Sequence, residues 1–223
     1  MVVQNLEKGY KHTKIGVIPE DWSIKSISMI SKVVRGGSPR PAGDPKYFKG
    51  NFIPWLTVAA LTNIPEYQVY VNETYDFLTK EGSKFSRTLS KKTLIISNSG
   101  ATLGVAKILK IKCCANDGIA ALLEIEKHIH PLYLFYYLNS ITQKLRIIAT
   151  GNGQPNLNTA LIGEVVIPIP SSKEEQIAII KILFDIDLLL GSFDNLIVTL
   201  YLKCTSDVEF VFFGKKLLFS III

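Results

Sequence analysis

The sequence of 223 residues predicts an α+β domain followed by a long α-helix that pairs with another helix. Short β-rich segments separated by clusters of Gly, Asn and Pro are typical of strands and turns. A proline at position 131 opens a helical segment. From residue 179 onward, apolar residues recur at alternating steps of four and three, which is the heptad pattern of a coiled coil.

The N-terminal part of the globular domain is predicted to begin with a turn, Gly16 to Trp22, followed by an apolar segment up to residue 34. The run Gly36-Gly37-Ser38-Pro39-Arg40-Pro41 interrupts regular structure and starts a loop that continues to Asn51. Residues 52–58 then have the composition of a strand, and Pro54 within them indicates an edge strand or a bulge.

The middle of the chain is predicted to contain two paired strands, 93–97 and 105–109, around an Asn98-Ser99-Gly100 turn. Residues 119–125 form a further strand. A helix is expected to begin at Pro131, with an apolar face made of Leu134, Leu138, Ile141 and Leu145. Short strands combined with few helices give the α+β class.

The long helix is predicted to begin after Ser172, which lies three residues before Glu175 in the spacing of a capping box. Its pairing seam consists of Ile179, Leu183, Ile186, Leu190, Phe193, Ile197, Leu200 and Cys204. Gly191 weakens such a helix by about 1 kcal/mol. We therefore divide the chain into a globular domain (1–171), a pairing helix (172–213) and a tail (214–223).

The formal charge of +6 is compatible with a polyanionic partner but does not require one. Its distribution is more informative. Residues 1–50 hold nine Lys/Arg against four Asp/Glu, and residues 79–92 hold five against one, as expected of a phosphate-binding face. Neither a signal peptide nor a run of about 18 apolar residues is present, so we expect a cytoplasmic protein with no membrane association.

The sequence lacks the motifs of several enzyme classes. It has no G-x-x-x-x-G-K-[ST] phosphate loop and no Asp/Asn-Pro-Pro-Tyr methyltransferase motif. The run Gly151-Asn152-Gly153 lacks the third glycine of a dinucleotide fingerprint. The three cysteines have no C-x-x-C spacing, and the aspartate of the Asn116-Asp117-Gly118 turn has no obvious metal partner. We expect no catalytic site, no cofactor and no metal.

The order of several short motifs resembles the specificity subunits of type I restriction-modification enzymes. The motifs are Ile15 to Trp22, Gly36-Gly37-Ser38-Pro39, Ile53-Pro54-Trp55-Leu56, Ile167-Pro168-Ile169-Pro170 and Glu174-Glu175-Gln176. The resemblance implies a target recognition domain in residues 1–171 and a spacer helix in residues 172–213. It also implies a half-length, non-catalytic subunit that acts on double-stranded DNA with a methyltransferase (modification) subunit and a restriction subunit. One domain with one helix favours self-association as a homodimer.

Three loops offer side chains for DNA. The first carries Arg35, Arg40, Lys46 and Lys49, the second carries Lys84 and Arg87, and the third carries Asn152, Gln154 and Asn156. Arg40 lies between two prolines that restrict its backbone, so it is a candidate for base or phosphate contact, although it is also a candidate for a solvated loop charge. The lysines are expected at phosphates. The third loop either contacts base edges or caps the preceding helix, and Trp55 is expected in the core.

The segment 198–213 departs from the resemblance, because its outer face is apolar where the family's spacer helix is polar. Two further hypotheses stand beside DNA recognition, and this departure prompts the second of them. One is a coiled-coil interaction module that does not bind DNA. The other is a non-functional fragment of a specificity subunit.

Overall fold

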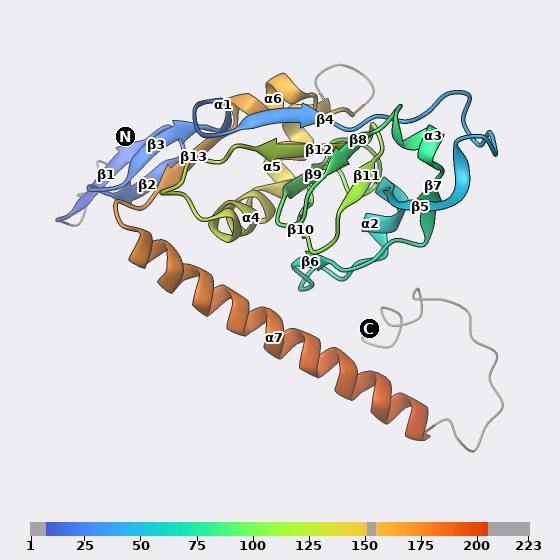
Figure 1. Cartoon of the computed structure of the whole chain (residues 1–223). Helices are drawn as coiled ribbons and strands as arrows, with labels where there is room; N and C mark the ends of the chain where they lie inside the picture. Colours follow the sequence, from blue (N-terminus) through green and yellow to red (C-terminus); the bar gives the residue numbers. More distant parts are fainter. Residues whose placement is uncertain (1–7, 151–154, 205–223) are drawn as a thin grey trace.

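The computed structural model describes residues 8–150 and 155–204, and it consists of a globular α+β domain from which one long helix projects (Figure 1). The strands are β1 (Tyr10–Thr13), β2 (Gly16–Pro19), β3 (Ser23–Ser26), β4 (Lys32–Arg35), β5 (Phe48–Leu56), β6 (Tyr70–Val71), β7 (Asp76–Leu78), β8 (Arg87–Leu89), β9 (Leu94–Ser97), β10 (Ala106–Leu109), β11 (Cys113–Ala115), β12 (Ile119–Leu123) and β13 (Val166–Ile169). The helices are α1 (Ile27–Ile30), α2 (Val58–Thr62), α3 (Lys80–Ser83), α4 (Pro131–Ser140), α5 (Thr142–Ala149), α6 (Thr159–Glu164) and α7 (Lys173–Cys204).

Two mixed sheets form the centre of the domain. One has the strand order β4-β12-β9-β10-β6, and the other has the order β7-β5-β11-β8. Most neighbouring strands are antiparallel, but β10 and β6 are parallel, as are β11 and β5. Two small ribbons, β1-β2 and β13-β3, lie at the end of the domain where α7 begins (Figure 1).

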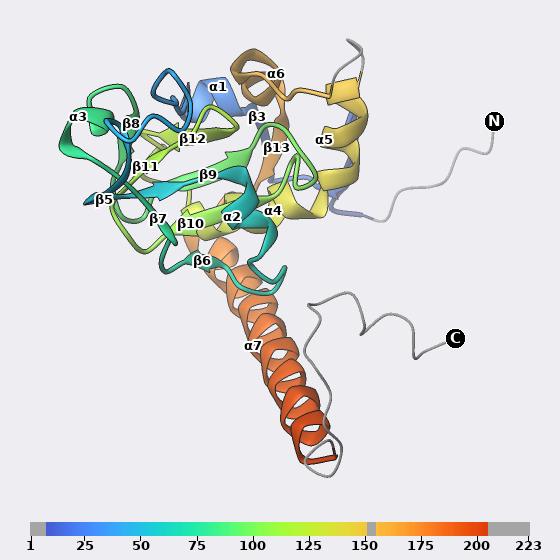
Figure 2. The same cartoon turned by 90° about the vertical axis from the view of Figure 1, so that its right-hand side faces the viewer.

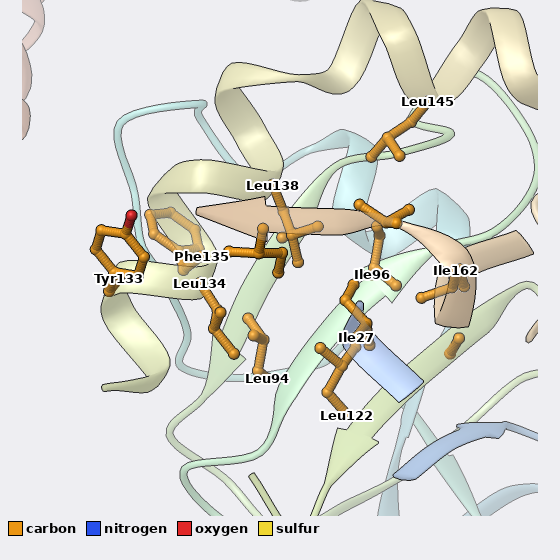
Figure 3. Packing of buried hydrophobic residues seen from close by; sticks show 14 of the residues in the cluster. Ile27, Leu94, Ile96, Leu122, Tyr133, Leu134, Phe135, Leu138, Leu145 and Ile162 are labelled. Carbon is orange, nitrogen blue, oxygen red and sulfur yellow. The ribbon is translucent and has the colours of Figure 1, made fainter. Parts of the chain in front are cut away.

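The larger core cluster lies between the five-stranded sheet and helices α1, α4, α5 and α6 (Figure 3). Phe135 and Leu138 of α4 pack with Leu94 and Ile96 of β9. All four side chains are buried, and burial of one such side chain stabilises a fold by about 1.5–3 kcal/mol. The helical side of the domain is therefore fixed to the sheet by close apolar packing.

The second core cluster lies between the two sheets. Ile95 of β9 belongs to it, whereas its chain neighbours Leu94 and Ile96 belong to the larger core cluster. The reason is that successive side chains of a strand point to opposite faces. Leu56 of β5 and Cys113 of β11 contribute from the other sheet. The five-stranded sheet is thus buried on both faces, which explains the continuous apolar runs in β9 and β12.

The structure confirms the predicted pairing of 93–97 with 105–109, which appear as antiparallel β9 and β10. The expectation of an edge strand at Pro54 is wrong, because β5 lies between β7 and β11. A register shift is present in β5, but it lies between Phe48 and Ile53, and Pro54 itself pairs regularly with Phe77. The helix expected from Pro131 is two helices, because the backbone leaves helical geometry at Ile141, whose amide bonds to the Leu138 and Asn139 carbonyls.

The predicted long helix is confirmed as continuous from Lys173 to Cys204. Its first turn forms half of the expected capping box, since the Glu175 amide donates to Ser172 Oγ over 3.1 Å. The other half is replaced by a tertiary bond, in which Trp22 Nε1 donates to Glu175 Oε1 over 3.1 Å. The helix start is thereby tied to the N-terminal turn of the domain.

One stripe of α7 faces its own domain. Gln176 is 1% exposed and bonds to two backbone groups: its Oε1 accepts from the His130 amide and its Nε2 donates to the His128 carbonyl. Four residues later, Ile180 belongs to the larger core cluster, and Phe184, eight residues later, packs against that cluster. These positions recur at helical spacing and dock the first three turns of α7.

The same stripe continues through polar contacts along the middle of α7. Tyr136 donates to Asp187 Oδ2 over 2.8 Å, and Tyr67 bonds to Asp194. A Cβ at Gly191 would lie 3.2 Å from the Tyr67 ring, so glycine allows the ring to approach closely. The loop that carries Tyr67 is held by the buried Lys107, whose Nζ donates to the Pro65 and Glu66 carbonyls over 2.8 and 3.2 Å. Burial lowers the pKa of Lys107 to about 8.

The pairing seam lies on a different face of α7 from this stripe, and its central residues are uncovered. The exposed fractions of Ile186, Leu190, Phe193 and Ile197 are 48%, 49%, 53% and 47%. Leu183 is half-buried, and Ile179 packs against the core of its own domain. The side chains of Leu200 and Cys204 and the predicted segments 205–213 and 214–223 lie outside the described residues.

Replacement of Gln176 by leucine removes both bonds to the backbone of residues 128 and 130. We expect the free energy of unfolding to fall by about 1–3 kcal/mol, because two partly buried backbone groups lose their partners. Urea denaturation of the variant measures this. Lys181→Leu, at an exposed position of the same helix, is the control. Equal stability of the two variants would contradict the docking role of Gln176.

Candidate nucleic-acid interface

The loop that follows β4 lies directly on the turn between β11 and β12. The Gly37 amide donates to the Ala115 carbonyl over 2.9 Å, and the Gly36 amide donates to the Ile119 carbonyl over 2.8 Å. A Cβ at Gly36 would lie 2.1 Å from the Asn116 carbonyl oxygen. Only glycine permits this approach, which is the physical reason for a glycine at position 36.

The Asp117 carboxylate is the centre of the polar cluster that results. Ser38 Oγ donates to Asp117 Oδ1 over 2.8 Å, and Arg40 Nη2 lies 3.6 Å from Asp117 Oδ2. Arg35 Nε donates to the Asp117 carbonyl over 2.6 Å. The side chain of Arg40 is 74% exposed, and such ion pairs contribute only about 0.2–1 kcal/mol, so Arg40 remains available to another acceptor.

A third arginine joins this cluster from β8. Arg87 Nε donates to the Arg35 carbonyl over 2.7 Å. Both side chains remain exposed. The structure therefore brings Arg35, Arg40 and Arg87 together from two separate segments of the chain. We call these arginines, together with Ser38 and Asp117, the arginine cluster. Figures 1 and 2 show β8 and β11 next to each other, and in Figure 1 they lie in the half of the domain away from the beginning of α7.

The third predicted loop joins the cluster through a buried asparagine. Asn98 Nδ2 donates to the Asp117 carbonyl over 3.2 Å, and the Asn98 carbonyl accepts from the Leu157 amide over 2.8 Å. Asn156 is exposed beside Leu157, and its amide bonds to the Ala149 carbonyl at the end of α5. The Asn156 backbone therefore helps to end the helix, while its side chain faces solvent. Asn152 and Gln154 lie outside the described residues.

The predicted lysines form a second group rather than joining the arginines. Lys46 Nζ lies 5.4 Å from the centre of the Tyr47 ring, which packs edge-to-face on Phe85 at 5.3 Å. Lys84 pairs with Glu81 over 2.7 Å. Lys49 is exposed in the β5 bulge with a φ of 59°. Trp55 is 6% exposed beside Phe48, so its expected place in the core is confirmed.

Sequence reasoning missed three residues of the arginine cluster. Asp117 was seen only as a turn residue, Asn98 only as part of a strand connection, and Ser38 only as part of a loop. The two turns Asn98-Ser99-Gly100 and Asn116-Asp117-Gly118 were visible in the sequence, but nothing in their spacing shows that they meet. Arg146 was also missed; its Nε donates to the Leu103 carbonyl over 3.2 Å and supports the connection after Asn98.

Apart from the Asp117 carboxylate, the exposed charged groups of the cluster are the guanidinium groups of its arginines, which suit the binding of an anion or of base edges. Within residues 8–150 and 155–204, no three His, Cys, Asp or Glu side chains are arranged to hold a metal ion. In the same part of the chain, no helix is long and apolar enough to cross a membrane.

Comparison with known proteins gives a family match over most of the chain. Residues 19–193 match the type I restriction modification DNA specificity domain. The matched range includes the Gly36 loop, the Asp117 turn and α7 as far as Phe193.

Curated relatives agree with this match. The MjaIX specificity subunit of a type I restriction enzyme from Methanocaldococcus jannaschii is 31% identical over 83% of this chain and 43% of its own length. The StySPI specificity subunit from Salmonella potsdam is 24% identical over 81% of this chain and 38% of its own length. The chain thus spans about two fifths of the length of these relatives.

Solved structures share the fold. A structure described as the basis of complex assembly and conformational transition of the type I R-M system superposes with a TM-score of 0.66 at 19% identity. It covers 87% of this chain and 45% of the other. The HsdS subunit from Thermoanaerobacter tengcongensis gives 0.61 at 20% identity, over 84% of this chain and 42% of the other.

Gly36→Ala tests the close approach on which the arginine cluster depends. We expect it to lower the free energy of unfolding by about 1–3 kcal/mol, because the added methyl group overlaps a backbone oxygen. Gly37→Ala is the matched control, since a Cβ there would meet its nearest atom at 3.4 Å. Thermal denaturation should separate the two variants. If Gly36→Ala is as stable as Gly37→Ala, the loop does not lie on the turn as described.

Proposed function

This chain belongs to the type I restriction-modification DNA specificity family, and from that premise we propose that its globular domain recognises double-stranded DNA. One observation carries the proposal. Arg35, Arg40 and Arg87 converge, with exposed side chains, on the loops around the Asp117 turn. Guanidinium groups bind phosphates and guanine edges in bidentate geometry, which is the chemistry that recognition of a duplex requires.

The two groups of basic residues have different proposed roles. The arginine cluster contacts base edges, because Arg40 is held by two prolines and a carboxylate in a defined position. Lys46 precedes β5, Lys49 lies within it and Lys84 ends α3, and these lysines contact phosphates, which fix the orientation of the protein without carrying sequence information. Asn152, Gln154 and Asn156 add further base or backbone contacts from the third loop.

We propose that the protein acts as a non-catalytic specificity subunit in the cytoplasm. A methyltransferase subunit and, through the complex, a restriction subunit would carry out the chemistry. The family membership supports these partners.

We further propose that two copies pair through the exposed seam of α7. Ile186, Leu190, Phe193 and Ile197 are each about half exposed, and two apolar seams of this kind bury one another when helices pair. A helix of 32 residues is about 48 Å long at 1.5 Å per residue. An antiparallel pair places the two domains more than one DNA turn of about 34–36 Å apart, so the target is an inverted repeat with an unspecified spacer.

DNA binding is tested with two substitutions of different expected effect. Arg40→Ala should weaken binding to the preferred sequence by about 1–3 kcal/mol and alter the sequence preference. Lys46→Ala should weaken binding to all sequences alike and reduce the slope of log K against log salt by about 1. Fluorescence anisotropy at several salt concentrations measures both effects, in the presence of the methyltransferase subunit.

Lys181→Ala, an exposed cation on α7, is the control and should leave the affinity and the salt slope unchanged. Absence of DNA binding by the unaltered complex would instead favour the coiled-coil interaction module, whose globular domain binds protein rather than DNA.

Self-association is tested by Leu190→Asp combined with Ile197→Asp. We expect the dimer to dissociate, because each buried aliphatic side chain stabilises the pair by about 1.5–3 kcal/mol and a buried carboxylate opposes it. Light scattering coupled to gel filtration gives the molar mass. Ser192→Asp with Thr199→Asp, on the other side of the helix, is the control. A seam variant that keeps the mass of the unaltered protein would exclude this interface.

A further inference from the structure

The arginine cluster contains a negative charge that a DNA-binding face would ordinarily exclude. The side chain of Asp117 is 42% exposed, so its carboxylate is accessible to solvent and to a ligand. It forms an ion pair with Arg40, whereas Arg35 bonds to the Asp117 carbonyl and Arg87 bonds to the Arg35 carbonyl. A carboxylate at this place repels DNA phosphates, which lowers affinity for any duplex. Its presence therefore needs a reason other than affinity.

The fold does not need the charge of Asp117. The side-chain bond that anchors the loop, from Ser38 Oγ over 2.8 Å, requires only an acceptor oxygen. The remaining bonds use backbone atoms of Asp117: its carbonyl accepts from Arg35 and Asn98, and its amide contacts Ser38 Oγ at 3.4 Å. An asparagine offers the same acceptor and the same backbone, so the charge itself acts on Arg40 and on the ligand.

We propose that Asp117 is a specificity-determining residue, whose carboxylate holds Arg40 in the free protein and disfavours DNA that offers Arg40 no better acceptor. This inference rests on the proposed function. The N7 and O6 atoms of guanine accept two bonds from one guanidinium, and they replace the single long contact of 3.6 Å. Because Arg40 is 74% exposed, the exchange costs little.

DNA of another sequence does not offer Arg40 the same pair of acceptors. Without a suitable base edge, Arg40 either stays on Asp117 or turns to a phosphate. In the first case it gives the DNA no contact, and in the second it leaves the carboxylate unneutralised beside the anionic backbone. Specificity of this kind comes from a repulsive element that acts against the wrong partner as well as an attractive one for the right partner.

The test is Asp117→Asn in the full chain, with the methyltransferase subunit present. A randomised duplex library gives the preferred sequence by selection, and anisotropy gives the affinity for preferred and random duplexes. We expect the variant to bind random duplex several-fold more tightly. We expect the ratio of preferred to random affinity to fall about tenfold, which is within the discrimination of one bidentate contact. Unchanged thermal stability of the variant would show that the loop remains anchored.

Asp44→Asn is the matched control. Asp44 belongs to the same loop and its Oδ1 accepts from the Lys46 amide over 2.9 Å, so the substitution removes the same charge and keeps the acceptor. Within the part of the chain that the structure describes, no ion pair of Asp44 with an arginine is present. We expect the preference for the selected sequence to persist in this variant.

A second variant separates charge from anchoring. Ser38→Ala removes the loop bond but keeps the carboxylate, so it should weaken binding to the preferred sequence without tightening binding to random duplex. The proposal is overturned if Asp117→Asn keeps the affinity ratio of the unaltered protein, or if Asp44→Asn lowers the ratio as much. If the unaltered complex binds no duplex at all, the proposed function itself is overturned. That outcome differs from a complex that binds DNA but whose affinity ratio does not depend on Asp117.

Discussion

The candidate interface depends on one steric constraint, the contact between the backbone at Gly36 and the backbone at Asn116. A side chain at position 36 would overlap the Asn116 carbonyl at 2.1 Å, so the loop can lie on the turn only if Cβ is absent. Once the loop lies there, Ser38 reaches the Asp117 carboxylate and Arg40 stands beside it. A backbone contact between distant segments thus brings these charged side chains close together.

Two faces of the long helix have different surroundings. The stripe from Gln176 through Asp187 to Asp194 attaches it to its own domain, partly by polar bonds to His130, Tyr136 and Tyr67. The seam from Ile186 to Ile197 is free of the domain and exposed. Gly191 lies on the face of the helix that meets the domain. Its cost to helix propensity is about 1 kcal/mol, yet a Cβ there would crowd the Tyr67 ring at 3.2 Å.

The sequence predicted the parts of the fold that local pattern determines. The α+β class, the β9-β10 pairing and the long helix follow from alternation, turn residues and heptad spacing. The position of β5 inside its sheet does not, because Pro54 describes only its own strand and not the strands on either side. The break at Ile141 was also hidden, since the apolar spacing of Leu138 and Leu145 continues through it.

The candidate site was predictable by residue type but not by arrangement. Clustered charge identified the loops that carry Arg35, Arg40 and Arg87, whereas their convergence arises from contacts between residues about 80 positions apart, such as Ser38 and Asp117. The same limit hid Asp117, because a carboxylate in a turn has no meaning for binding until its partners are known. If this face recognises DNA as proposed, the Asp117 carboxylate and a base edge compete for Arg40. The selectivity of the proposed site would then depend on how far a base edge exceeds a carboxylate as a partner for one guanidinium.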